Sequence, residues 1–259
     1  MVIRFKSNQT KKLNESIEDS NVKDIWLKNF DGTEESVDSI CEILGIKRED
    51  LTEAYIPNGV TRIGDWAFED CTSLTSVTIG NGVKSIGYEA FYGCTSLTSI
   101  TIPDSVTSIE ASAFECCESL TRITIPDSVT SISSSAFSYC RSLKNITIPN
   151  SVTRIEDHAF STCESLTSIT IPDSVREIGF GVFFQCDSLT SVTIPDSVTR
   201  IGSLAFANCP SLKSVTIGNG VTKIGRDVFA NYNDLTVTTN NPYVIDYCEE
   251  NSIDYIDRI

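Results

Sequence analysis

The 259-residue chain lacks a long apolar run. No stretch reaches the roughly 18 apolar residues that are needed to cross a bilayer, so membrane insertion is not expected. The N-terminus, which reads MVIRFK, also lacks the apolar core of a secretion signal. The chain as written is therefore expected in the cytoplasm, and a surface or secreted location would require that a leader had been removed.

Excess positive charge is also missing, because the net charge is −15. The acidity is spread along the chain, with −3 in residues 1–50, −8 in residues 51–235 and −4 in residues 236–259. Nucleic-acid binding requires a basic stripe, and docking on anionic lipid requires a basic cluster. Neither kind of partner is expected, and the negative charge is interpreted as a source of solubility.

The sequence contains little of what an enzyme or a metal site needs. His158 is the single histidine and has no Ser or Cys nucleophile nearby in a plausible triad, so it is expected to be a surface residue. The cysteines lack the C-x₂-C spacing of zinc sites. Recurring turns supply only one Asp or Asn each, whereas calcium needs about six to eight oxygens. We therefore expect no enzyme, no metal and no other cofactor.

What the sequence has instead is a strict 23-residue repeat. Phe, Ile, Val and Leu columns keep this spacing between residues 51 and 235. Self-similarity at such a period is typical of a solenoid, in which each unit packs on the next. The same period places seven cysteines, at Cys71, Cys94, Cys117, Cys140, Cys163, Cys186 and Cys209.

The polarity pattern within one unit predicts its local structure. In residues 74–79, LTSVTI, apolar residues alternate with Ser and Thr, which favours a β-strand. A turn reading PDS or GNG, a second short strand and a tight 3₁₀ or α turn complete the unit. Eight positions are expected in the core, and in the second unit they are Leu74, Val77, Ile79, Val83, Ile86, Ala90, Phe91 and Cys94.

The phrase SLTSVTIPDSVTRIGSLAFANC, residues 188–209, resembles the 23-residue BspA-like class of leucine-rich repeats. The resemblance covers about residues 51–235. It implies a leucine-rich-repeat solenoid of about eight coils, with parallel β-strands, short strands and 3₁₀/α turns, capped at both ends. A right hand is expected from the general rule for parallel crossovers. Bacterial members of this class are commonly surface or secreted proteins, and the missing leader departs from that pattern.

The repeat divides the chain into three parts. Residues 1–50 are expected to be an N-terminal cap over the first coil, and a separate binding module is the alternative. Residues 51–235 form the repeats. Residues 236–259 are expected to form a C-terminal cap, in which Asn241 and Pro242 begin a helix that a closing strand follows. The N-terminal part contains the spacing of an amphipathic helix, at Val37, Ile40, Cys41 and Leu44.

The cysteine column admits two interpretations, redox chemistry or buried packing. Stacked side chains that point in parallel do not adopt the roughly perpendicular dihedral angle of a disulfide. A free cysteine ordinarily behaves as a small core residue. We therefore expect inert core thiols. Cys116 lies outside the column and is expected to be more exposed than its neighbour Cys117.

Two polar columns are expected on the outer face of the main strands, one of Thr and one mostly of Ser. Ice binding would need two flat, unbroken ladders, and Arg122 and Asn145 interrupt the second. Exposed threonine is also an ordinary strand residue. We interpret the middle of this face as a candidate partner-binding surface, formed by Arg122, Thr124, Asn145, Thr147 and Thr170.

A second candidate surface lies where the repeat stops repeating. Tyr88 and Tyr92 are four residues apart, and Phe180 and Phe184 occupy the same two columns four units later. Aromatic residues at i and i+4 of a helical turn share one face, and aromatics are enriched at binding hot spots. The alternative is that each pair only shields the edge of the turn.

These observations favour a non-enzymatic protein–protein interaction module. Its partner would be a protein that contacts the Ser/Thr-rich strand face, the exposed aromatic pairs, or both. The alternative is a cell-surface adhesin that binds a host protein or a glycan, as the bacterial relatives suggest. That alternative requires an extracellular location.

Overall fold

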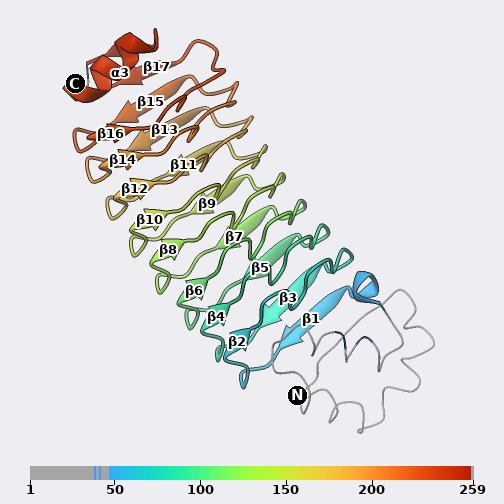
Figure 1. Ribbon diagram of the computed structural model, residues 1–259. Helices are drawn as coiled ribbons and strands as arrows, with labels where there is room; N and C mark the ends of the chain where they lie inside the picture. The colour runs from blue at the N-terminus through green and yellow to red at the C-terminus, as the bar shows by residue number, and fades with distance from the viewer. Residues whose placement is uncertain (1–37, 39–40, 42–46, 258–259) are drawn as a thin grey trace, which may run out of the picture.

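The computed structural model describes residues 38, 41 and 47–257, which form one elongated stack of coils (Figure 1). The coils are numbered here from residues 51–73 (coil 1) to residues 212–234 (coil 8). Of the helix expected over residues 37–44, the structure describes Asp38 and Cys41, and both are helical. The remainder of the expected N-terminal cap up to residue 46 lies outside the described residues. A 3₁₀ helix, η1 (Arg48–Asp50), precedes the first coil.

Each coil contributes one main strand to a parallel sheet of ten strands. The register joins residues one repeat apart, so that Val77 lies beside Ile100 and each sequence column becomes a ladder along the stack. The strands are β1 (Glu53–Ile56), β3 (Ser76–Ile79), β5 (Ser99–Thr101), β7 (Arg122–Thr124), β9 (Asn145–Thr147), β11 (Ser168–Thr170), β13 (Ser191–Ile194), β15 (Ser214–Ile217), β17 (Thr236–Thr238) and β18 (Asp254–Ile256).

The second short strand of each coil forms two further ladders. A three-stranded sheet contains β2 (Arg62–Ile63), β4 (Ser85–Ile86) and β6 (Ser108–Ile109). A five-stranded sheet contains β8 (Ser131–Ile132), β10 (Arg154–Ile155), β12 (Glu177–Ile178), β14 (Arg200–Ile201) and β16 (Lys223–Ile224).

A serine hydroxyl lies at the break between these two sheets. In neighbouring coils a backbone N–H donates to the isoleucine carbonyl of the preceding coil, as Glu110 does to Ile86 at 2.9 Å. In coil 4 the Ser133 hydroxyl donates to the carbonyl oxygen of Ile109 instead, at 2.7 Å. The side chain therefore satisfies an acceptor that the backbone satisfies elsewhere.

The core is a continuous column of stacked residues. The phenylalanines from Phe68 to Phe229 lie ring over ring, with centroids 5.1–5.7 Å apart and planes within 15° of parallel. All eight positions expected in the core of the second unit are buried. Burying each large apolar side chain contributes about 1.5–3 kcal/mol, so several coils together offset the cost of ordering the backbone.

The segment expected as a 3₁₀ or α turn forms consecutive hydrogen-bonded turns. Within coil 1 the N–H of Glu69 donates to the carbonyl of Trp66, three residues earlier, at 3.0 Å. The preceding N–H, that of Phe68, donates instead to the carbonyl of Ala90 in coil 2 at 2.7 Å. Because alternate N–H groups bond to the next coil, the segment does not continue as a helix. Trp66 and Asp70 have φ values of 56° and 54°, in the left-handed region.

The C-terminal end of the stack carries the expected helix and strand. Helix α3 (Pro242–Glu250) begins with Pro242, and the Asn241 side chain accepts the N–H of Tyr243 at 3.0 Å. The Asn241 amide also donates to the carbonyl of Val221 in coil 8 at 2.8 Å, which ties the helix to the repeats. Strand β18 pairs with β17 and extends the main sheet beyond the last coil.

Candidate interaction surfaces

The cysteine column is buried and carries a repeated hydrogen bond. The seven cysteines of the column are at most 1% exposed, and all ten thiols of the chain are free. From Cys94 onward, each thiol donates to the carbonyl oxygen of the phenylalanine in the preceding coil, at 3.1–3.3 Å. The expectation of core thiols is confirmed. The sequence reasoning missed that the thiol also satisfies a backbone acceptor.

Burial also suppresses the thiolate. Desolvation raises the pKa of Cys71 and Cys209 to about 12, and it raises the pKa of Cys94, Cys140 and Cys163 well above the ordinary value. Because the thiolate is the nucleophile and the metal ligand, these cysteines are chemically quiet. Cys116 is half-buried, as predicted from its place outside the column.

Two members of the Asp and Asn column at the turns have a structural role. The Asp196 carboxylate accepts the backbone N–H of Asn219 in the next coil at 2.8 Å, and Asn58 accepts that of Asn81 at 2.9 Å. In the part of the chain that the structure describes, no group of three or more His, Cys, Asp or Glu side chains could hold a metal ion. These turns therefore link coils through side-chain acceptors.

The strand face consists of the outward side chains of the main strands. All five residues proposed from the sequence lie on it and are exposed: Arg122, Thr124, Asn145, Thr147 and Thr170. The register places Arg122 beside Asn145 and Thr124 beside Thr147. These side chains come from three neighbouring strands and form one continuous surface.

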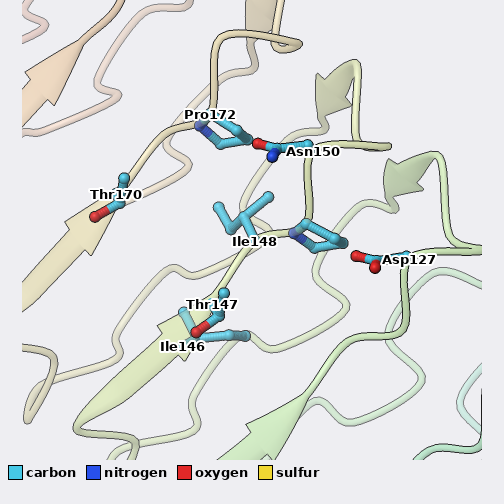
Figure 2. A pocket seen from close by; sticks show the side chains of 8 residues that line it. Asp127, Ile146, Thr147, Ile148, Asn150, Thr170 and Pro172 are labelled. Atoms are coloured by element: carbon cyan, nitrogen blue, oxygen red, sulfur yellow. The ribbon is translucent and has the colours of Figure 1, made fainter.

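A shallow groove opens at the carboxyl end of this face, between β9 and β11 (Figure 2). Its volume is about 430 Å³, and it is lined by Asp127, Ile146, Thr147, Ile148, Pro149, Asn150, Thr170 and Pro172. The two strands are paired at one position, Thr170 with Thr147, whereas β7 and β9 are paired at three. The groove therefore lies where the main sheet is least tightly paired, and two of the predicted threonines line it.

The turn edge consists of residues 64–72 in coil 1 and the equivalent residues in each later coil. Among the described residues of the repeats, every large hydrophobic side chain that is clearly exposed lies on this edge. The residues are Trp66, Tyr88, Tyr139 and Phe180, each 38–40% exposed. The other exposed large hydrophobic side chains are on the C-terminal elements, at Tyr243, Tyr255 and Ile256.

The Tyr88 ring is held by residues of the preceding coil. Its backbone N–H donates to the Asp65 carboxylate at 2.9 Å. Its ring packs edge-on against Trp66, with ring centroids 5.7 Å apart and an interplanar angle of 85°. This is a favourable aromatic arrangement. The exposed ring therefore has a defined position on the surface.

Phe180, four coils later, has the same kinds of contact with the coil that precedes it. Its backbone N–H donates to the Asp157 carboxylate at 2.7 Å, and its ring packs edge-on against His158 with centroids 5.0 Å apart. The His158 ring lies 2.8 Å from the place that a Cβ would take on Gly181, which has a φ of 57°. A larger residue there would have to displace the His158 ring, whereas the backbone conformation itself is adopted by non-glycine residues in other coils, as by Glu89 with a φ of 52°.

Tyr92 and Phe184 are half-buried rather than fully exposed. The Tyr92 hydroxyl hydrogen-bonds to Cys116 in the next coil, and the pKa of Tyr92 rises to about 12 because of the negative charge of a Cys116 thiolate and because of burial. The aromatic contacts of Tyr88 and Phe180 are thus with Trp66 and His158 of the preceding coil. The i, i+4 pairing predicted from the sequence does not describe these contacts.

Sequence reasoning missed three turn-edge residues. Trp66 contacts Tyr88 of the next coil, and His158 contacts Phe180 of the next coil. In both contacts the separation along the chain is one residue less than the repeat. Tyr139 is exposed and lies under the Arg141 guanidinium, whose carbon is 5.5 Å from the ring centroid. A search for aromatic residues at an offset one short of the repeat would have found the first two contacts.

No helix among the described residues has the length and apolar character required to cross a bilayer.

Comparisons with known proteins agree with this architecture. The family model for the BspA type leucine rich repeat region matches residues 47–166 and 153–254, with six copies. A leucine rich repeat protein of T. pallidum, TpLRR, is 32% identical with a TM-score of 0.56, and the match covers 62% of this chain and 77% of that chain. A search of curated protein sequences found no match.

Two other solved structures are more distant in geometry or in sequence. A leucine rich cell surface protein from Faecalibacterium prausnitzii A2-165 is 34% identical over 73% of each chain, with a TM-score of 0.44. The pneumococcal vaccine antigen PcpA is 19% identical, with a TM-score of 0.51 and coverage of 81% of this chain and 68% of that chain. The family match spans most of the described residues, and the chain belongs to the BspA type leucine rich repeat family.

Proposed function

We propose that this protein is a non-enzymatic protein–protein interaction module that contacts its partner through the turn edge and the strand face. The observation that carries the proposal is the distribution of exposed aromatic side chains. In the described repeats they lie on one edge of the stack, at Trp66, Tyr88, Tyr139 and Phe180. Exposed aromatic groups held in fixed positions are the usual anchors of protein interfaces.

The strand face supports a second contact area. It is rich in hydroxyl groups, and its middle carries Arg122 and Asn145 in place of serine. Arginine is enriched in interfaces because its planar guanidinium can donate several hydrogen bonds. A binding role, and not catalysis, is also supported by His158, whose ring packs on Phe180 and over Gly181.

The test is affinity capture of partners from the native source, followed by quantitative mass spectrometry. One variant, Phe180→Ser with Phe184→Ser, removes apolar contacts from the turn edge. A second, Thr147→Lys with Thr170→Lys, changes the strand face. Thr107→Lys is the matched control, because Thr107 is exposed on a different side of the coil. We expect at least one double variant to lose a partner that the control retains. If both retain every partner, the surface assignment is wrong.

The groove between β9 and β11 favours a second candidate, an adhesin that binds a glycan. Thr147, Thr170 and Asn150 line this groove together with Pro149 and Pro172. Hydroxyl and amide groups beside apolar surface suit a sugar, which has both polar and apolar faces. A glycan screen with the wild-type protein and with Asn150→Ala tests this candidate. Binding that the substitution does not weaken would exclude the groove as the site.

A further inference from the structure

The turn edge is strongly acidic in its first three coils. Residues 64–72, 87–95 and 110–118 contain no Lys, Arg or His. The equivalent segments of the five later coils contain fewer acidic residues per segment. They also contain Arg141, His158 and Arg226. The acidic residues of the first three segments are Asp65, Glu69, Asp70, Glu89, Glu110, Glu115 and Glu118.

Glu89 interacts with the two exposed aromatic residues of this region. The indole N–H of Trp66 donates to the Glu89 carboxylate at 3.1 Å. The Tyr88 hydroxyl also hydrogen-bonds to Glu89, which raises the pKa of Tyr88. The same two rings pack edge-on against each other. A carboxylate and two aromatic rings are therefore held together at the surface.

Glu115, in the next coil, adds a second carboxylate. Burial and the nearby charge of Glu89 raise the pKa of Glu115, while Ser112 and His158 lower it. Arg62 forms ion pairs with Asp65 and with Glu110, each at 2.6 Å. Glu89 and Glu115 form no ion pair of 4 Å or less with any residue that the structure describes.

We propose that Trp66, Tyr88, Glu89 and Glu115, the aromatic–acidic patch, bind lysine or arginine side chains of a basic segment in a protein partner. This inference rests on the proposed function and names the chemistry of the partner for one of its surfaces. A cation near an aromatic ring is attracted by the electrons of the ring face. A cation here also relieves the repulsion between the two carboxylates, neither of which is ion-paired with a residue that the structure describes.

The Phe180 site is the matched comparison within the same molecule. It repeats the arrangement of an Asp, a ring in the preceding coil and an exposed aromatic. Gly181, however, stands at the column position that Glu89 takes in coil 2. Among the described residues, no carboxylate hydrogen-bonds to the His158 ring in the way that Glu89 accepts the indole N–H of Trp66. The Phe180 site therefore lacks the counterpart of Glu89, and we assign the basic partner segment to the patch in coils 1–3.

The experiment uses the full chain with Trp26→Phe, so that Trp66 is the single tryptophan. The probe is a 12-residue peptide of Lys and Arg alternating with Gly and Ser. Control peptides carry acetyl-lysine and citrulline, or glutamate, in place of the basic residues. We expect saturable binding of the basic peptide in Trp66 fluorescence and in calorimetry, weakened by added salt. Equal binding of the neutral peptide would overturn the proposal.

Two sets of variants locate the site by calorimetry. Glu89→Gln with Glu115→Gln is expected to weaken binding of the basic peptide by about two- to thirtyfold, as the loss of two charge contacts near the surface would. Tyr88→Leu is expected to weaken it by about two- to fivefold through the lost cation–π contact. Phe180→Ser with Phe184→Ser is expected to leave it unchanged. If the Glu variants bind as tightly as the wild type, the assignment fails.

Residues 1–14 of the chain are the competing occupant, because they carry four positive charges and no acidic residue, at Arg4, Lys6, Lys11 and Lys12. Replacing these four residues with Ala should leave peptide affinity unchanged. A gain in affinity would show that the chain occupies its own patch, and would overturn the proposal of a partner.

Partner capture distinguishes failure of this inference from failure of the proposed function. Suppose that the protein does not bind the basic peptide but captures a partner that the Phe180/Phe184 variant loses. The proposed function then stands, and only the proposal of a basic partner segment fails.

Discussion

The Sγ atom of Cys140 donates a hydrogen bond to the carbonyl oxygen of Phe114, 3.3 Å away in the preceding coil. The same carbonyl accepts the backbone N–H of Cys117 within its own coil, also at 3.3 Å. The cysteine thus packs as a small hydrophobic residue and donates to a buried carbonyl. The same contact recurs from Cys94 to Cys209, so these thiols contribute both packing and a hydrogen bond to the core.

This burial predicts a simple pattern of thiol reactivity. The chain has ten cysteines, and Cys116 is the single one that is not fully buried. We expect one thiol to react rapidly with a chromogenic disulfide reagent in the folded protein, and ten to react in denaturant. Because burial and Glu115 raise the pKa of Cys116, its reaction should accelerate as the pH rises.

Cys116→Ser is the control for this experiment. The variant should lose the rapid phase and retain the nine thiols that react after unfolding. A rapid phase that remains in Cys116→Ser would show that a cysteine of the buried column is accessible, in contradiction to the packing.

The phenylalanine column predicts a large loss of stability at its centre. Phe137 is fully buried and stacks on Phe114 and Phe160. Phe137→Ala should lower the free energy of unfolding by about 3–5 kcal/mol, because it removes apolar contacts and leaves a cavity. Urea unfolding followed by circular dichroism measures the change. Phe180→Ala should cost less than about 1 kcal/mol, because Phe180 is 39% exposed. Equal losses would contradict the description of the core.

The left-handed backbone of the turn edge predicts opposite effects of two substitutions at one position. Gln185 is exposed and has a φ of 57°. Gln185→Gly should stabilise the protein by about 0.5–1 kcal/mol, because relief of about 1–2 kcal/mol of strain exceeds the entropic cost of glycine. Gln185→Val should destabilise it, because a β-branched residue tolerates this conformation poorly. The midpoint of urea unfolding measures both. Two shifts of the same sign would contradict this account.

The raised pKa of Glu115 predicts that replacing this residue stabilises the protein in a pH-dependent way. Burial raises its pKa first, and Glu89 adds to the shift, against the opposing effects of Ser112 and His158. A raised pKa in the folded state means that the ionised carboxylate costs stability as the pH rises through that pKa. Glu115→Gln should therefore stabilise the protein at pH 7 and have little effect near pH 4, where the carboxyl is largely protonated. Unfolding at the two pH values checks this, and an equal gain at both would contradict it.

Much of the fold was predictable because the repeat constrains it. A column that returns once in every repeat must stack on itself, and alternating apolar residues such as Val77 and Ile79 can be buried together only on a strand. The core positions, the parallel strands and the outward threonines follow from this spacing. The helix and strand after Asn241 were predictable from capping chemistry and polarity.

The candidate surfaces were predictable in part. The sequence identified Tyr88 and Phe180 as departures from the repeat, and both are exposed. Their partners Trp66 and His158 were missed, because the coils pair backbone groups at the turn edge with an offset one residue short of the repeat. A helical i, i+4 contact was expected instead, because local spacing does not show that alternate backbone N–H groups donate to carbonyl groups of the next coil.

The sequence by itself determined the solenoid, its period and its core, because each of these depends on the same residue type recurring at one spacing. The tertiary structure decided which variable residues meet, because contacts between coils depend on register and backbone direction. Glu89 is one residue away from Tyr88 in the chain, and its hydrogen bond to Trp66, the ring on which Tyr88 packs, is evident only when coil 2 lies on coil 1. The groove at Thr147 and Thr170 likewise depends on how tightly two neighbouring strands pair.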